Sequence, residues 1–292
     1  MRIASYAGRL TMLVDGGGID IGAATGGSFP SDVLEALERW DELKDVVAGL
    51  REPLVHPVDP ALLEAPVRLP RQVFAIGLNY RDHATEAGIQ ELPKAPPVFT
   101  KFPVCVTGPE ATVALPSPDV DYEVELVAVI GRRAEHVAEG DAWDYVAGLT
   151  VGQDLSERKV QLAGPVPQFS LGKSFSGFGP TGPAIVSIDE FADPGALDLG
   201  CSVGGELLQA GNTKDMIFGV PELIARLSRV CPLLPGDLVF TGTPAGVGMG
   251  RTPQRFMRPG DTLTSFVESV GAIHTTFTAG PGYGSGSAAS EE

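Results

Sequence analysis

Two glutamates stand two residues apart in the stretch Asp121–Ile130, which reads DYEVELVAVI. The stretch alternates as a β-strand does, so Glu123 and Glu125 project from one face and lie about 6.5–7 Å apart along it. Two carboxylates that lead into an apolar run are costly to bury unless a positive charge lies between them. Mg²⁺ or Mn²⁺, which prefer oxygen ligands, would supply that charge. The alternative is an exposed strand end that carries two solvated acids.

A histidine and a glutamate are three residues apart in Leu78–Gly88, LNYRDHATEAG. A helix that begins at Asn79 or Asp82 would end at Gly88. His83 and Glu86 would then share a helix face and touch. Such a pair can act as a general base with its orienting acid. The alternative is an ordinary surface pair.

Two further charged residues stand at positions where ligands are common. Asp154 follows the predicted strand Val146–Gln153, and the C-terminal tip of a strand often carries a ligand. As the alternative, Asp154 would cap a helix over Leu155–Leu162. Lys173 is the single cation in the Gly/Ser/Phe-rich stretch Gln168–Pro183. It would be partly buried and directed at an anion or a carboxylate cluster, or it would snorkel to solvent.

The loop Thr241–Gly250, TGTPAGVGMG, is rich in glycine and carries two threonines. Glycines let main-chain N–H groups approach an anion closely, and the hydroxyls add donors. The loop lacks the GK[ST] ending of a Walker loop, and it is not a GxGxxG at a helix start. The pattern therefore indicates an anion-binding turn without a nucleotide signature.

The elements that must position these residues are mostly short strands, because 37 glycines and 25 prolines indicate many turns. Strands are predicted at Ile3–Tyr6, Leu10–Val14, Val73–Gly77, Phe99–Lys101, Cys105–Thr107, Leu238–Thr241, Thr262–Val267 and Ala272–Phe277. A hairpin is predicted over Leu199–Gln209, with its turn at Gly204-Gly205. One helix is expected from a cap at Ser31 to about Leu50, and another begins at Pro221.

The composition limits the partners. A formal net charge of −16 argues against nucleic acid and anionic membranes. Cys105, Cys201 and Cys231 are odd in number and form no CxxC pair, which fits a reducing cytosol without a disulfide framework. The N-terminus lacks an apolar segment of signal-peptide length, and no apolar run approaches about 18 residues. We expect a cytoplasmic protein in which a small anionic substrate needs a local cluster of cations or a metal.

Seven segments together resemble the fumarylacetoacetate hydrolase (FAH) family in order and spacing over about residues 72–277. They are GLNYRDHATEAG (77–88), PPVFTKFP (96–103), DYEVELVAVIGRRA (121–134), VAGLTVGQDLSERKVQ (146–161), LGKSFSGFGPTGPAI (171–185), GGELLQAGNTKDMIFGVPELIARLS (204–228) and LLPGDLVFTGTPAGVG (233–248). The resemblance implies a β-rich α+β fold, the mixed β-roll called the FAH fold, usually in a homodimer. We expect a small N-terminal α/β subdomain with a connector at 1–70, the catalytic domain at 71–278 and a disordered tail at 279–292.

The resemblance also implies roles for single residues. It implies Mg²⁺ or Mn²⁺ bound by Glu123, Glu125 and Asp154. His83 and Glu86 would sit on a lid-like helix and activate water, and Lys173 would help to polarise a 2-oxo acid. The implied substrate contacts are Thr243 and Gly242 at the substrate carboxylate, with Arg81, Tyr80 and Gln161 lining the pocket. The chain departs from the usual family pattern at Gln153, Ser176, Gly179 and Gly204, which leaves the ligands intact but alters the pocket wall.

The implied activity is hydrolysis of a carbon–carbon bond in a β-diketo acid of the acylpyruvate or fumarylpyruvate type, as in aromatic catabolism. The same site could instead serve a decarboxylase or isomerase of a 2-oxo or 2-hydroxydiene diacid, such as oxaloacetate or 2-hydroxyhepta-2,4-diene-1,7-dioate. The presence of both His83 and Glu86 favours hydrolysis. A non-catalytic, metal-dependent binding protein is disfavoured, because His83, Glu86 and Lys173 are all present.

Overall fold

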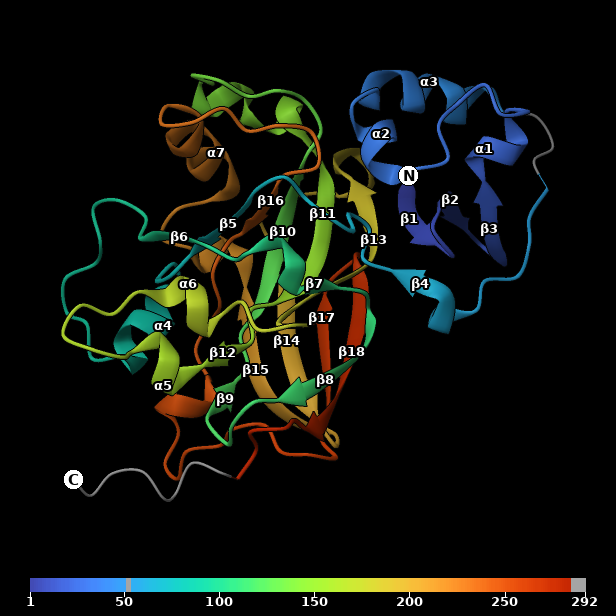
Figure 1. The fold of residues 1–292 in the computed structure, drawn as a ribbon. Coiled ribbons are helices and arrows are strands. Elements are labelled where there is room, and N and C mark those ends of the chain that lie inside the picture. The colour runs from blue at the N-terminus through green and yellow to red at the C-terminus, as the bar shows by residue number, and fades with distance from the viewer. Residues whose placement is uncertain (51–53, 285–292) are drawn as a thin grey trace.

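The computed structural model describes residues 1–50 and 54–284. Within these residues an eleven-stranded sheet runs in the order β3-β2-β1-β13-β11-β10-β16-β5-β6, with β4 paired to β1 and β7 to β13 (Figure 1). Its strands are β1 Arg2–Tyr6, β2 Arg9–Val14, β3 Gly17–Asp20, β4 Leu63–Glu64, β5 Val73–Ile76, β6 Val98–Thr100, β7 Val106–Thr107, β10 Val124–Ile130, β11 Val146–Gln153, β13 Gly179–Ser187 and β16 Leu238–Phe240. The predicted β-rich α+β fold is therefore confirmed.

A second, five-stranded sheet has the order β15-β14-β17-β18-β8. Its strands are β8 Glu110–Leu115, β14 Asp198–Val203, β15 Glu206–Asn212, β17 Thr262–Val267 and β18 Gly271–Ala279, and a small ribbon joins β9 Val120–Asp121 to β12 Ser156–Glu157. The two sheets share one apolar core, in which Leu126 of β10 and Val151 of β11 lie with Val267 of β17 and Ile273 of β18. One face of β10 is thus buried against the second sheet.

Short helices cover the remaining surfaces. They are α1 Ile21–Ala24, α2 Val33–Leu37, α3 Trp40–Gly49, α4 Arg81–Glu86, α5 Arg158–Gln161, α6 Phe169–Gly172 and α7 Val220–Ser228, with 3₁₀ turns at Pro60–Leu62, Pro103–Cys105, Glu139–Tyr145, Ile188–Glu190, Thr213–Asp215 and Gly248–Gly250. In Figure 1 the blue N-terminal elements lie to the right of β13, whereas α4, α5 and α6 lie together on the left. None of the helices in the described part of the chain is long and apolar enough to cross a membrane.

The predicted helix from Ser31 to Leu50 is in fact two helices. Asp32, not Ser31, caps α2 by accepting a hydrogen bond from Glu35 N at 3.0 Å. The helix is interrupted at Arg39, whose φ of −120° and ψ of 37° are not helical. The Arg39 guanidinium lies 4.6 Å from the Phe29 ring centroid. Because the helix is interrupted there, Leu37 and Trp40 both pack into one core with β10. This tertiary packing cannot be read from helical spacing alone.

The predicted strand Asp121–Ile130 also proves to be two strands, β9 and β10, separated at Tyr122–Glu123. Every residue of β10 is buried, so the alternation does not separate a core face from a solvent face. Leu126 and Ala128 pack toward the second sheet, and Val127 and Val129 pack toward the N-terminal helices. The reading of Glu123 and Glu125 as solvated acids on an exposed strand end is therefore wrong.

Of the remaining local predictions, those that depend on short-range contacts are confirmed, and one that depends on contacts far along the chain is wrong. Strand β11 has the predicted bounds, and the hairpin turns at Gly204-Gly205 with positive φ at both residues. The helix predicted over Leu155–Leu162 is wrong, because β12 occupies its first turn and Glu157 caps the short α5 by accepting from Val160 N. Asp154 is consequently no helix cap. The three cysteines are free, as expected.

The two ends of the chain bear on the predicted domains. Strand β1 pairs antiparallel with β13, so the N-terminal piece at 1–70 continues the large sheet. At the other end, Ala279 still pairs with Leu115 of β8, and Tyr283 packs against the core beneath that sheet. Most of the predicted disordered tail, residues 285–292, lies outside the described residues.

Candidate metal centre and proton-transfer site

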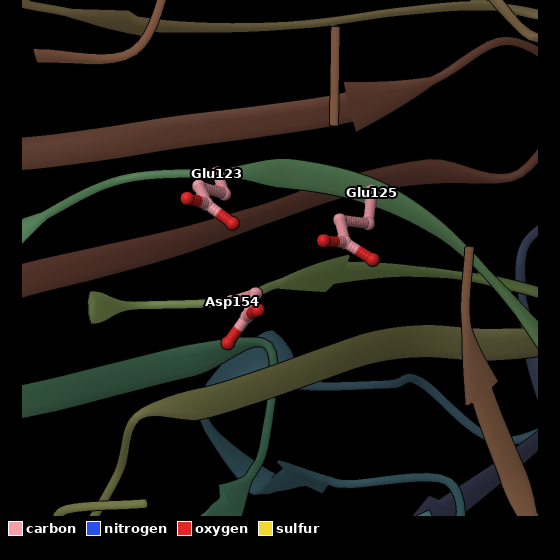
Figure 2. Close-up of side chains that lie close together, drawn as sticks. All are labelled: Glu123, Glu125 and Asp154. Carbon is pink, nitrogen blue, oxygen red and sulfur yellow. The ribbon is translucent and has the colours of Figure 1, made fainter. Parts of the chain in front are cut away.

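Three buried carboxylates meet at the polar end of β10. Glu123 precedes β10, Glu125 is its second residue, and Asp154 follows the neighbouring strand β11. Antiparallel pairing sets Val124 opposite Gln153, and Asp154 N donates to Glu123 O at 2.9 Å. Figure 2 shows the two glutamate side chains extending from the same side of the strand toward Asp154. One oxygen of each group lies within 4.8 Å of the others, and all three residues are at most 6% exposed.

Two of the three carboxylates have cationic partners. Lys173 Nζ donates to Glu123 Oε2 at 2.8 Å and to Asp154 Oδ2 at 2.6 Å, and Arg158 lies 2.8 Å from Glu123 Oε1. Burial by itself raises the pKa of Glu123, but the charges of Lys173 and Arg158, with a smaller contribution from His83, lower it to about 2. Glu123 is therefore held ionised.

Glu125 has a different environment. Among the described residues its recorded hydrogen-bond donor is Gly242 N, at 2.7 Å from Oε2, and it has no ion pair. Burial, and then the charges of Asp154 and Glu123, raise its pKa well above the ordinary value. Beside it, the Tyr80 hydroxyl is buried without a partner in the described part of the chain, and burial followed by the charge of Glu125 raises the Tyr80 pKa. Among the described residues, no cationic side chain forms an ion pair with Glu125, so this part of the cluster lacks a balancing positive charge.

A hard divalent cation fits this donor set. Three convergent carboxylate oxygens are ligands that Mg²⁺ and Mn²⁺ prefer, and such an ion would stabilise the ionised form of Glu125. Lys173 was predicted to be partly buried and directed at an anion or a carboxylate cluster; it is only 1% exposed, so it is buried more deeply than expected, and its direction toward a carboxylate cluster is confirmed. Its third hydrogen bond goes to Ser156 Oγ at 2.8 Å.

The predicted His83–Glu86 contact is present on α4. His83 Nδ1 lies 3.0 Å from Glu86 Oε2, and both side chains are partly buried. Glu86 Oε1 in turn accepts a hydrogen bond from Gly246 N at 3.0 Å, so the pair connects α4 to the loop Thr241–Gly250. Neither Asn79 nor Asp82 caps this helix: Tyr80 is the N-cap residue, without a side-chain bond. The Asn79 amide instead binds main-chain groups of Thr241 and Phe218.

Several of the predicted substrate-binding groups are already hydrogen-bonded within the protein. Thr243 Oγ1 donates to Val124 O and accepts from Gln209 Nε2, each at 2.8 Å, and Gly242 N is bonded to Glu125. Gln161 Oε1 accepts from Arg158 at 2.8 Å. Arg81 is exposed on the first turn of α4. Substrate binding by Thr243, Gly242, Arg81, Tyr80 and Gln161 stays a prediction.

Sequence reasoning missed several residues that build the centre. Lys101 Nζ donates to Asp154 Oδ1 at 2.6 Å. Arg158 also pairs with Asp121 at 2.6 Å, and Asp121 accepts from Gly248 N at 2.7 Å. Gln153 Oε1 accepts from Glu123 N at 2.9 Å, across the break between β9 and β10. For Lys101 and Gln153 the available signal was a polar side chain next to apolar residues, whereas Arg158 and Asp121 lie in polar stretches and carry no such signal.

A β-rich roll of two packed sheets, with carboxylates gathered around a buried lysine, defines a candidate divalent-metal protein. The chain belongs to the fumarylacetoacetate hydrolase family: residues 72–278 match the model of the fumarylacetoacetate (FAA) hydrolase C-terminal region. The family resemblance drawn from the sequence is thereby confirmed.

Three similar proteins sharpen this placement. The mitochondrial oxaloacetate tautomerase FAHD2B of Bos taurus is 40% identical over 262 residues, which cover 88% of this chain and 83% of that protein. A structure from Mycobacterium smegmatis, provisionally named HpcE, has a TM-score of 0.92 and 46% identity, covering 96% and 99% of the two chains. Maleylpyruvate hydrolase from Sphingobium sp. SYK-6, in complex with manganese(II) and pyruvate, has a TM-score of 0.78 and 29% identity, covering 96% and 100%.

These relatives include a tautomerase and a hydrolase, so the family's enzymes catalyse more than one reaction. The higher identity to the tautomerase supports the isomerase alternative better than the carbon–carbon hydrolysis that we expected first. The homodimer and the cytoplasmic location stay predictions.

Proposed function

We propose that the protein is a divalent-metal-dependent isomerase that interconverts the keto and enol forms of a 2-oxo diacid of the oxaloacetate type. The observation that carries the proposal is the buried cluster of Glu123, Glu125 and Asp154 around the Lys173 ammonium, with the His83–Glu86 pair nearby. The cluster would hold a divalent cation, whose charge can stabilise an oxyanion, and the pair supplies a proton acceptor. The 40% identity to an oxaloacetate tautomerase supports the same choice.

Glu123, Glu125 and Asp154 would hold Mg²⁺ or Mn²⁺, which when bound polarises an oxo group and orients the carboxylate beside it. Lys173 adds a fixed positive charge where negative charge develops on the oxo oxygen. Burial lowers its pKa, but Asp154 and Glu123 more than offset this and raise the pKa above the ordinary value, so Lys173 remains an ammonium. All three of its N–H groups are already bonded to Glu123, Asp154 and Ser156.

His83 is the proton acceptor in this proposal. Its Nδ1 is engaged by Glu86, which leaves Nε2 to take a proton from the carbon next to the oxo group. The electron pair of that C–H bond forms the carbon–carbon double bond, and the π electrons of the oxo group move to its oxygen. That oxygen takes a proton from solvent to give the enol, and His83 releases its proton to solvent. No bond between heavy atoms breaks, so neither water nor a second product is required.

The experiment follows the ultraviolet absorbance of enol-oxaloacetate with Mg²⁺ or Mn²⁺, and carbon dioxide and pyruvate in parallel. Accelerated enol loss without carbon dioxide or pyruvate is the expected result. Solvent deuterium should enter the methylene carbon faster than in buffer, and this gain should vanish in His83→Ala. Enol decay at the rate of buffer plus metal would contradict the proposal.

Hydrolysis of an acylpyruvate is the second candidate. The observation in its favour is the intact His83–Glu86 contact at 3.0 Å, because the same pair could activate water. A relative named maleylpyruvate hydrolase shares the fold at 29% identity. Pyruvate release from an acylpyruvate, with no effect on enol-oxaloacetate, would establish this candidate in place of tautomerisation.

The homodimer implied by the family resemblance is also kept as a proposal. Light scattering on the eluted protein should give about twice the 30.5 kDa mass of one chain. A mass of one chain at micromolar concentration would reject it.

A further inference from the structure

A second lysine, Lys101, is fully buried beside the carboxylates. It follows β6, and its main-chain N donates to Val73 O of β5 at 3.2 Å. Its side chain is 0% exposed and leads from this edge of the large sheet toward the end of β11, with Nζ 5.9 Å from the Phe240 ring centroid. An ammonium without water is costly unless its donors are paired in a fixed geometry.

The partners of Lys101 are both parts of the candidate site. Its Nζ donates to Asp154 Oδ1 at 2.6 Å and to the main-chain carbonyl of Lys173. The other oxygen of Asp154 accepts from Lys173 Nζ at 2.6 Å. Each oxygen of Asp154 therefore has its own lysine, and Lys173 is held at both its main chain and its ammonium. Lys101 closes a ring of contacts through Asp154 and Lys173.

We propose that Lys101 is a positioning residue, which orients Asp154 as a metal ligand and fixes the Lys173 ammonium between Asp154 and Glu123. The inference deepens the proposed function and rests on it for the reaction, but not for metal binding. Two simpler roles compete with it. Lys101 could act by charge alone, or it could stabilise the fold alone.

Metal binding separates the three roles because each predicts a different change in Mn²⁺ affinity when Lys101 is replaced: an increase, a decrease or no change. Mn²⁺ affinity is measured by electron paramagnetic resonance for wild type, Lys101→Met and Lys101→Arg. A lysine that acts by charge alone repels Mn²⁺, so Lys101→Met would bind it more tightly and Lys101→Arg would match wild type. A positioning lysine requires one compact ammonium that a planar guanidinium does not reproduce. Both variants should then bind Mn²⁺ about 10-fold more weakly, the lower end of the effect for partners of metal ligands.

The melting temperature and a control variant test whether Lys101 only stabilises the fold. A lowered Tm with unchanged Mn²⁺ affinity would mean that Lys101 stabilises the fold alone, and would overturn the inference. Lys94→Met, which removes a 91%-exposed lysine, is the matched control and should change neither quantity. If Lys101→Met fails to fold, Lys101→Arg decides alone: affinity equal to wild type rejects positioning, and a roughly 10-fold loss supports it.

Turnover of oxaloacetate is measured on the same samples. With Lys173 displaced, kcat should fall more than KM changes, since Lys173 acts on the developing charge. A wild-type protein that binds Mn²⁺ but does not accelerate tautomerisation would reject the proposed function. The Mn²⁺ affinities of the two Lys101 variants would still decide the present inference.

Discussion

The two ends of β10 are equally buried but are stabilised in different ways. At one end Val127 and Val129 pack among apolar side chains of the N-terminal helices and β16. At the other end, Glu125 and the preceding Glu123, which lies just before the strand, extend into a group of carboxylates and cations. Burial of the apolar end needs only complementary volume, whereas burial of the polar end needs matched charges and donors. A single strand thereby supplies both a rigid support and one ligand of the candidate metal centre.

Replacement of Glu125 by glutamine should break the polar end most completely. The variant keeps an acceptor for Gly242 N but loses a metal ligand, so Mn²⁺ affinity should fall more than about 100-fold, beyond the loss expected for an outer partner of a ligand. Turnover should fall with it. Calorimetric titration with Mn²⁺ measures the change. Unaltered Mn²⁺ affinity would show that the carboxylates do not form a metal site.

Replacement of His83 by alanine should divide the polar centre into a binding part and a proton-transfer part. Turnover should drop by about 10²–10⁴-fold, the usual contribution of a general base, while Mn²⁺ affinity stays nearly unchanged. Steady-state kinetics and a Mn²⁺ titration on one preparation test both statements. Loss of metal binding in this variant would mean that His83 has a different role.

The residue after Glu125 tests the apolar support. Leu126 is fully buried between the two sheets, so Leu126→Ala should lower the free energy of unfolding by about 2–5 kcal/mol through lost burial and a cavity. Denaturant unfolding with EDTA measures this loss. The Mn²⁺ affinity of the folded variant should match wild type, and a weakened affinity would show that the two ends of β10 are coupled.

The smallest expected effect is a pH dependence that belongs to the polar end alone. Burial, with the charges of Asp154 and Glu123, raises the pKa of Glu125 in the folded state, so the folded protein holds that proton more tightly than the unfolded chain does. In EDTA, this group therefore lowers stability as pH rises from its ordinary pKa of about 4.3 toward the folded value. Glu125→Gln lacks this loss, so its Tm should exceed that of wild type by a margin that widens with pH, about 2–4 °C for each kcal/mol. A margin independent of pH would contradict the assignment.

Local pattern predicted those parts of the fold that local forces decide. The bounds of β11 and the Gly204-Gly205 turn follow from apolar runs and from glycine's tolerance of positive φ. The break at Arg39 and the short strand at Ser156–Glu157 depend on partners far along the chain, and no pattern within a window contains them.

The site was predictable to a similar extent. Glu123 and Glu125 were placed on one face by the period of a strand, and the His83–Glu86 contact by that of a helix. The convergence of Asp154 with them came from the family resemblance, because it depends on the register of β10 with β11. Lys101 lies 53 residues from Asp154 and carries no spacing signal, so only the folded chain reveals their contact.

The pairing of β1 with β13 has a practical consequence for anyone who wishes to isolate the segment that matches the family. A fragment cut at residue 72 would leave the end of β13 at Ile185 and Val186 without the main-chain partners that β1 supplies. An uncovered strand end can pair with a strand of a second molecule, so we expect such a fragment to self-associate more readily than the whole chain.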